Sequence, residues 1–198
     1  MSGQKDDNKI RLGRMLLIGS AGRKCGKTAL ACRIIQKFRK QSIIAIKITT
    51  IGKTDKDFHH DLSALGKRGY IITEETKSNI KKDTSRMLIA GAVKVFWLRA
   101  EERSLRKGFT ALLERVGPDA VCVCESNSLR QIVEPGLFIM VKKRDGSKVK
   151  QSAKEVLNLA DRVIIYADEG FDNFLKDLKL VAGKWLMVKR NKKNAVKD

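Results

Sequence analysis

The chain has 198 residues, of which 42% are hydrophobic and 32% are charged, and it contains four cysteines. This length suits one α/β domain with a buried core and is short for two domains. The polar start lacks the apolar core of a secretory signal, and no apolar run approaches the ~20 residues that span a bilayer. The cysteines form no C-x-x-C pair, which argues against a zinc site or a disulfide scaffold. We therefore expect a cytoplasmic protein with no membrane segment.

The formal net charge is +20 at pH 7. Such an excess attracts polyanions, so a nucleic-acid partner is one interpretation. The other is a solvated, lysine-rich surface with a basic tail. The densest basic stretches, at 142–144 and 189–193, contain no aromatic residues that would stack on bases. We favour the solvated surface, and nucleic-acid binding is the less favoured alternative.

Strand and helix patterns alternate along most of the chain. Short apolar runs predict strands, and segments with an apolar face at helical spacing predict helices. In chain order we predict a strand at 14–19, a helix at 27–39, a strand at 42–48, an irregular polar segment at 49–81, a short helix starting at Asp83, a strand at 93–98, a helix at 101–116, strands at 120–124 and 136–141, a helix at 151–160, a strand at 162–166, a helix near 171–180 and a strand at 186–188.

This alternation predicts an α/β fold with a mostly parallel sheet of about seven strands and helices on both faces. We expect a single domain at 14–189, in which 49–81 is an irregular insert or lid. A polar tail at 1–13 and a basic tail at 190–198 flank it. Ligands of such sheets bind at the carboxyl ends of the strands.

A glycine-containing loop joins the first predicted strand to the first predicted helix. From Gly19 to Thr28 its sequence is GSAGRKCGKT. Glycines let the backbone N–H groups turn toward phosphate oxygens, and the positive end of the following helix adds to the field. The expected phosphate-binding residues are therefore Gly22, Arg23, Lys24, Cys25, Gly26, Lys27, Thr28 and Ala29.

Lys27 and Thr28 have separate expected roles in this loop. Lys27 would place its ammonium near the β- and γ-phosphates of a nucleoside triphosphate, and the Thr28 hydroxyl would bind Mg²⁺. The strict pattern G-x-x-x-x-G-K-[ST] has glycine where Ala21 stands, so the match is imperfect. Arg23 and Lys24 either contact phosphates or face water. The position between a buried strand and a helix still predicts the P-loop NTPase fold.

A carboxylate at the end of a neighbouring strand usually holds Mg²⁺ from a second side. Glu125 ends the strand at 120–124 and is the preferred candidate, both as a metal ligand and, with Lys27, as a catalytic residue. The alternative is that Glu125 only caps a turn. Asp83 is a second metal candidate, unless it only caps its helix.

Four segments together resemble the molybdopterin-guanine-dinucleotide biosynthesis protein B family, P-loop NTPases related to dethiobiotin synthetase. They are Cys25-Gly26-Lys27-Thr28, Ala45-Ile46-Lys47, Lys82-Asp83-Thr84-Ser85 with Ala90-Gly91-Ala92, and Val123-Cys124-Glu125. The resemblance covers roughly residues 14–128, in the order found in that family. The chain departs from it in a longer phosphate loop, in Ile48 where the family has His, in Ser126 where it has Gly, and throughout the segment after Leu129.

The resemblance implies several further properties. It implies binding of GTP or a related nucleotide with Mg²⁺, and an accessory role beside a protein partner in molybdenum cofactor biosynthesis. It also implies a homodimer, which is common in that family. By the same resemblance Lys47 is a second phosphate or substrate contact. The alternative is that Lys47 is an ordinary strand-end lysine.

Three functions stay open at this point. The first is a nucleotide-binding protein with slow NTPase or accessory activity. The second is an ATP-dependent small-molecule kinase or ligase of the dethiobiotin synthetase type, with 49–81 as its lid. His59, His60 and Asp61 would contribute there, although such a run in a charged loop is more often simply solvated. The third is a nucleic-acid-associated P-loop protein. No Asn-Lys-x-Asp motif selects guanine, so the choice of ATP or GTP is open. The segment at 142–146 either lies near the base or forms a plain turn.

Overall fold

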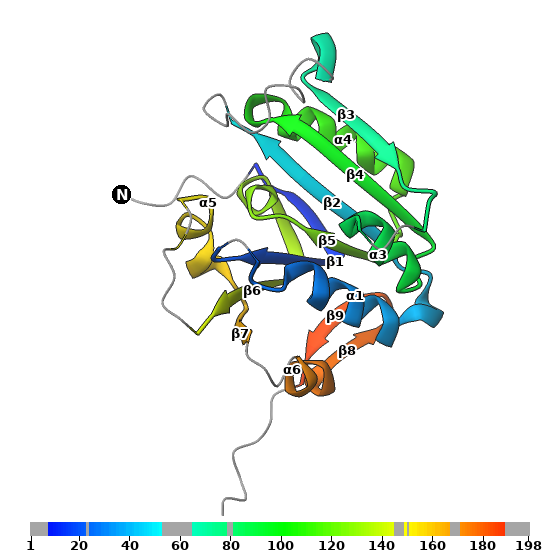
Figure 1. Ribbon diagram of the computed structural model, residues 1–198, viewed down its shortest axis with the longest axis vertical. Coiled ribbons are helices and arrows are strands. Elements are labelled where there is room, and N and C mark those ends of the chain that lie inside the picture. The colour runs from blue at the N-terminus through cyan, green and yellow to red at the C-terminus, as the bar shows by residue number, and fades with distance from the viewer. Residues whose placement is uncertain are drawn as a thin grey trace, which may run out of the picture.

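The computed structural model describes residues 8–22, 24–52, 65–78, 81–144, 149, 151–166 and 171–188. Within them, a seven-stranded sheet has the strand order β3-β4-β2-β5-β1-β6-β7 (Figure 1). Its strands are β1 (Ile10–Ser20), β2 (Ile44–Ile51), β3 (Tyr70–Glu74), β4 (Lys94–Glu101), β5 (Cys122–Glu125), β6 (Val133–Lys143) and β7 (Arg162–Tyr166). Neighbouring strands are parallel except β3, which is antiparallel to β4. The expected α/β fold with a mostly parallel sheet is confirmed.

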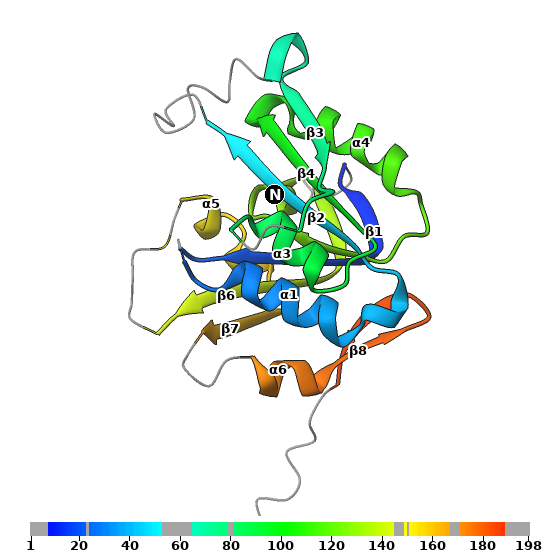
Figure 2. The ribbon, with the colours of Figure 1, turned by 45° about the vertical axis from the view of Figure 1, so that its right-hand side comes forward.

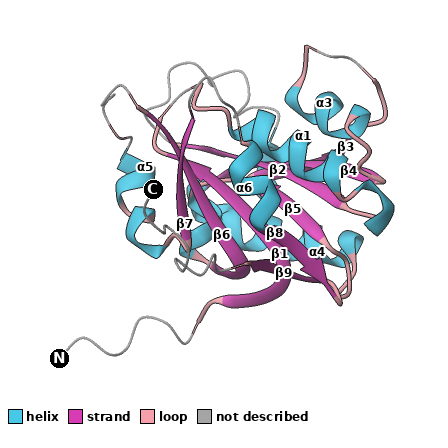
Figure 3. Cartoon of the chain, turned by 90° about the horizontal axis from the view of Figure 1, so that it is seen from below, coloured by secondary structure: helices cyan, strands magenta, loops and turns pink. Residues whose placement is uncertain are grey.

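Helices cover both faces of this sheet (Figures 2 and 3). One face packs against α1 (Lys27–Lys37), α3 (Asp83–Ile89) and α6 (Asp172–Asp177), and the other against α4 (Leu105–Val116) and α5 (Gln151–Lys154). Short 3-10 turns lie at Arg39–Gln41, Gly66–Arg68, Glu102–Ser104, Ser128–Gln131 and Leu157–Leu159. Among the described residues, no helix is long and apolar enough to span a membrane.

The two faces follow from the two-residue period of a strand. In β1, Leu16 and Ile18 belong to the core on the α1 face, while Met15 and Leu17 belong to the core on the α4 face. A strand buried on both faces reads as a continuous apolar run, which is why β1 was predictable. Cys122 and Cys124 both pack in the core on the α4 face, and burial raises the pKa of the Cys122 thiol to about 12.

The seventh strand of the sheet is not the predicted one. The segment 49–81 was expected to be irregular, but Tyr70–Glu74 forms β3 at the edge of the sheet. The predicted strand at 186–188 instead belongs to a separate hairpin of β8 (Leu178–Val181) and β9 (Lys184–Met187). Tertiary pairing decides both outcomes, because short half-buried strands carry a weak local signal.

Several predicted boundaries also need correction. β1 begins at Ile10, inside the segment expected to be a polar tail. The helix expected near 171–180 ends at Asp177 and is followed directly by β8. The helix expected at 151–160 spans only Gln151–Lys154 before a 3-10 turn.

Candidate functional site

A cavity of about 460 Å³ opens at the carboxyl ends of β1 and β5. These two strands are parallel neighbours, and Ile18 of β1 pairs in register with Glu125, the last residue of β5. The loop after β1 and the side chain that ends β5 are therefore brought together. The cavity is lined by Ser20, Gly22, Lys24, Cys25, Gly26, Lys27, Thr28, Ala29, Asp83, Arg86, Glu125 and Tyr166.

The loop between β1 and α1 has a backbone that depends on Gly26. This residue is the N-cap of α1 and has a left-handed φ of 83°. A Cβ there would lie 3.0 Å from Cδ2 of Tyr166 and 3.2 Å from Cζ of Phe171. Only glycine meets both the conformational and the spatial requirement. The start of α1 therefore presents bare backbone at the wall of the cavity.

Ala21 occupies the position where the strict phosphate-loop pattern has glycine. Its backbone N–H donates to the carbonyl of Val141 at 2.8 Å, and the residue is buried. In the described part of this loop, Lys24 is a non-glycine residue with a positive φ, whereas Ala21 does not have a positive φ. The backbone at Ala21 therefore has no conformational need for glycine, and alanine fits the loop.

Asn127 clamps the end of β1 from the turn that follows β5. Its Oδ1 accepts a hydrogen bond from the Ser20 N–H at 2.8 Å, and its Nδ2 donates to the Ser20 carbonyl at 2.9 Å. Gly19 makes room for this contact, because a Cβ there would lie 2.9 Å from Oδ1 of Asn127 and 2.4 Å from Sδ of Met140. Asn127 was not predicted from the sequence, where the available signal was a side chain with both a donor and an acceptor in the polar turn after Glu125.

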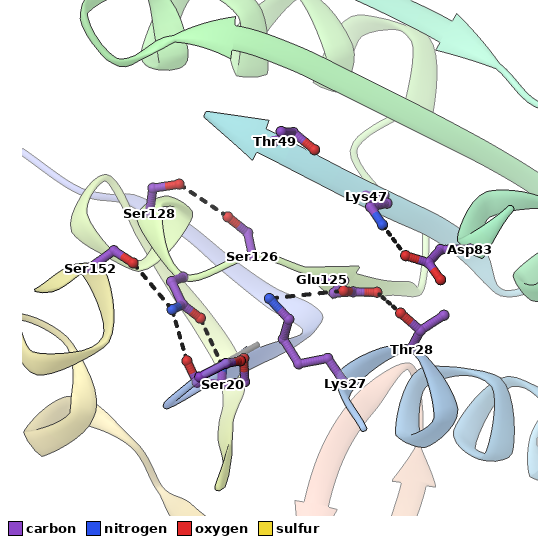
Figure 4. A network of polar contacts seen from close by, with 12 residues as sticks. Ser20, Lys27, Thr28, Lys47, Thr49, Asp83, Glu125, Ser126, Ser128 and Ser152 are labelled. Atoms are coloured by element: carbon purple, nitrogen blue, oxygen red, sulfur yellow. Dashed lines mark hydrogen bonds and ion pairs between the residues drawn. The ribbon is translucent and has the colours of Figure 1, made fainter. Parts of the chain in front are cut away.

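Thr28, Lys27 and Glu125 meet at the centre of the site (Figure 4). The Thr28 hydroxyl donates to Oε2 of Glu125 at 2.9 Å, and Nζ of Lys27 lies 3.9 Å from Oε1. Glu125 is only 6% exposed. A buried carboxylate is tolerable when a cation and a hydrogen-bond donor face it, and both are present here. The Glu125 side chain contacts Thr28 and Lys27 and does not cap a turn, which was the alternative role.

A second polar group borders the first. Lys47 of β2 forms an ion pair with Asp83, and the Arg86 guanidinium lies 3.7 Å from the other oxygen of Asp83. Lys47 pairs in register with Glu125, so the two side chains come from adjacent strands at the same level. Asp83 is the first residue of α3, whose N-cap is Lys82, so the alternative that Asp83 only caps its helix is wrong.

The structure brings together most of the residues predicted from sequence. Gly22, Lys24, Cys25, Gly26, Lys27, Thr28, Ala29, Asp83 and Glu125 line one cavity, and Lys47 contacts Asp83 at its border. Arg23, the residues His59, His60 and Asp61, and the turn at 145–146 lie outside the described residues. Tyr166 lines the cavity without having been predicted. Its position at the end of a strand was the available signal, but its proximity to Gly26 is a long-range contact.

The site offers few side-chain ligands for a metal. In the described part of the chain, no group of three or more His, Cys, Asp and Glu side chains is placed to hold an ion. The adjacent hydroxyl and carboxylate oxygens of Thr28 and Glu125 are hard donors. This donor set suits Mg²⁺, which typically binds through one or two carboxylates together with substrate phosphates and water.

Scans against protein-family models, curated proteins and solved structures found no match for this chain.

Proposed function

We propose that this chain is a P-loop protein that binds a nucleoside triphosphate with Mg²⁺ in the cavity at the start of α1. The observation that carries the proposal is the hydrogen bond from Thr28 to the buried Glu125, with Lys27 beside it. A hydroxyl in the first turn of a helix and a carboxylate at the end of the neighbouring strand in the sheet are the two protein ligands that such a metal needs.

Each part of the cavity would have a distinct task. The N–H groups at the start of α1 and the positive end of that helix would hold phosphate oxygens. Lys27 would move its ammonium from Glu125 to the β- and γ-phosphates. Thr28 and Glu125 would hold Mg²⁺, which would supply neutralisation of phosphate charge. Arg86 and Lys24 also line the cavity and could offset further charge.

The activity we propose is slow NTP hydrolysis or an accessory role in transfer. The site contains cations and hard oxygen donors, which act by positioning and by neutralising charge. The four segments that resemble the molybdopterin-guanine-dinucleotide family favour an accessory factor in cofactor biosynthesis, acting beside a protein partner. ATP and GTP both fit this proposal.

Titration calorimetry with non-hydrolysable ATP and GTP analogues and Mg²⁺ tests the phosphate site. We expect Lys27→Ala to raise the Kd roughly 10- to 100-fold, because a charge-assisted contact to phosphate is lost. Lys107→Ala, at an exposed position of α4 on the far face of the sheet, is the matched control and should bind like the wild type. Equal binding by the Lys27 and Lys107 variants would contradict the proposal.

A second cavity supports the alternative function, a small-molecule kinase or ligase. It measures about 320 Å³ and is lined by Thr73, Glu74, Glu75, Thr76, Lys77, Lys82, Thr84, Trp97 and Arg99. Lys82 and Thr84 flank Asp83, which lines the first cavity, so a second substrate there would border the nucleotide site. Incubation of a metabolite extract with γ-labelled ATP separates the two functions. A labelled small molecule that is lost with Lys27→Ala supports a kinase, label released as inorganic phosphate only when the extract is present supports a ligase, and label released equally without the extract supports hydrolysis.

A further inference from the structure

An aromatic ring, Tyr166, lines one side of the proposed nucleotide cavity and is stacked on a second, buried ring, Phe171. Tyr166 ends β7, and Phe171 immediately precedes α6. Their ring centroids are 5.2 Å apart, with 30° between the ring planes. Phe171 is buried, whereas Tyr166 is 39% exposed and lines the cavity. We call this pair the aromatic shelf.

The shelf is attached to the same helix that begins at the phosphate loop. Phe171 belongs to the core on the α1 face of the sheet. From α1, Nζ of Lys37 donates to the Leu178 carbonyl at 3.0 Å, and Arg33 pairs with Asp172 of α6. Because both rings lie against Gly26, the shelf is fixed relative to the start of α1. A ligand held by the loop therefore meets the shelf at a defined place.

The cavity differs chemically between its two ends. Glu125 lies on β5, on one side of β1, and the Lys47–Asp83 pair lies one strand further out, at β2. Tyr166 lies on β7, two strands away on the opposite side of β1. With neighbouring strands about 4.8 Å apart, the backbone of β7 is roughly 10 Å from that of β1, on the side away from Glu125. The phosphate loop lies between the two.

We propose that the aromatic shelf binds the base of the nucleotide by stacking on Tyr166, so that the site takes nucleoside triphosphates in preference to bare polyphosphate. This inference rests on the proposed function, because the phosphates must first occupy the loop. A flat apolar ring at one end of a charged cavity suits a base, and every base has a π-face. The shelf therefore adds affinity for ATP and for GTP with little discrimination between them.

The competing explanation is that Tyr166 only fills space over Gly26. In that case its loss would loosen the loop and weaken every phosphate ligand alike. Stacking on a base weakens only ligands that carry one. Inorganic tripolyphosphate with Mg²⁺ has the same phosphate chain and no base, so comparing it with a nucleotide separates the two roles.

The experiment measures calorimetric Kd values for Mg²⁺ complexes of an ATP analogue, a GTP analogue and tripolyphosphate. We expect Tyr166→Leu to raise both nucleotide Kd values roughly 5- to 100-fold and to leave tripolyphosphate unchanged. Tyr166→Phe, which keeps the ring, should retain nucleotide affinity. Thermal unfolding of each variant checks that the fold is kept.

Two outcomes would overturn the shelf as a base-binding element. In one, Tyr166→Leu weakens all three ligands equally; in the other, it weakens none while Lys27→Ala weakens all of them. A third outcome would contradict both proposals. If Lys27→Ala binds all three ligands as the wild type does, the proposed phosphate site is wrong, and so is the base-binding role of the shelf that depends on it.

Discussion

The carboxylate of Glu125 has two neighbours that would change when a nucleotide binds. In the structure it accepts from Thr28 and lies near the ammonium of Lys27. Phosphates would draw Lys27 away, which would leave a buried negative charge close to the negative charge of the ligand. A divalent cation between them removes that repulsion. Metal and nucleotide should therefore bind cooperatively, with Glu125 as the coupling residue.

The variant Glu125→Gln tests this coupling. The amide oxygen can still accept from Thr28, but the charge is gone. We expect nucleotide binding in EDTA to stay equal or improve, and the gain on adding Mg²⁺ to fall by roughly tenfold, since a charged metal ligand is lost. Calorimetry with and without Mg²⁺ measures both quantities. Glu114→Gln, at an exposed position of α4, is the control. An unchanged Mg²⁺ gain in Glu125→Gln would exclude Glu125 as a metal ligand.

The turn after β5 fixes the residue at which β1 ends. Asn127 makes two hydrogen bonds to the backbone of Ser20 and so fixes the point where β1 gives way to the loop before α1. Ser20 in turn donates from its hydroxyl to the Gly22 carbonyl at 2.8 Å. The strand that carries Glu125 and the loop that carries Lys27 are thus held together by the same turn.

The variant Asn127→Ala should lower both stability and affinity. Loss of two hydrogen bonds to partly buried backbone groups should cost about 1–3 kcal/mol of unfolding free energy, and a looser loop should raise the nucleotide Kd several-fold. Chemical denaturation and calorimetry measure these effects. Gln131→Ala removes an amide that donates to the exposed Glu155, and it serves as the control. If Asn127→Ala loses stability but keeps full affinity, the clamp supports the fold and not the phosphate site.

The secondary-structure elements differ in how far the sequence pattern could predict them. β1, α1 and β5 were predictable because continuous apolar strands and an amphipathic helix carry strong local signals. The proximity of Thr28 and Glu125 followed from these elements, since parallel neighbouring strands place their carboxyl ends together. β3 and β8 were missed because short strands are decided by their partners. Asn127 and Tyr166 were missed because each acts on a residue more than 100 positions earlier in the chain.

On the scale of the whole molecule, the dominant property is the net charge of +20. Several described ion pairs, such as Arg11–Glu134 and Arg33–Asp172, join side chains that are about half exposed or more. Such pairs contribute little to stability. A large uncompensated charge repels itself in the compact state, and salt screens that repulsion. The net charge should therefore weaken the fold at low ionic strength.

We expect the Tm at pH 7 to rise with NaCl between about 20 and 200 mM, over which the screening length falls from roughly 20 to 7 Å. A gain of about 1 kcal/mol would raise the Tm of a chain this size by about 2–4 °C. Calorimetric melting without nucleotide measures it. Near pH 10, close to the sequence pI, the same salt series should have little effect, because the net charge is then near zero. A Tm that falls with salt at pH 7 would instead mean that attractive ion pairs outweigh the repulsion, and that the positive charge is locally matched rather than spread over the surface.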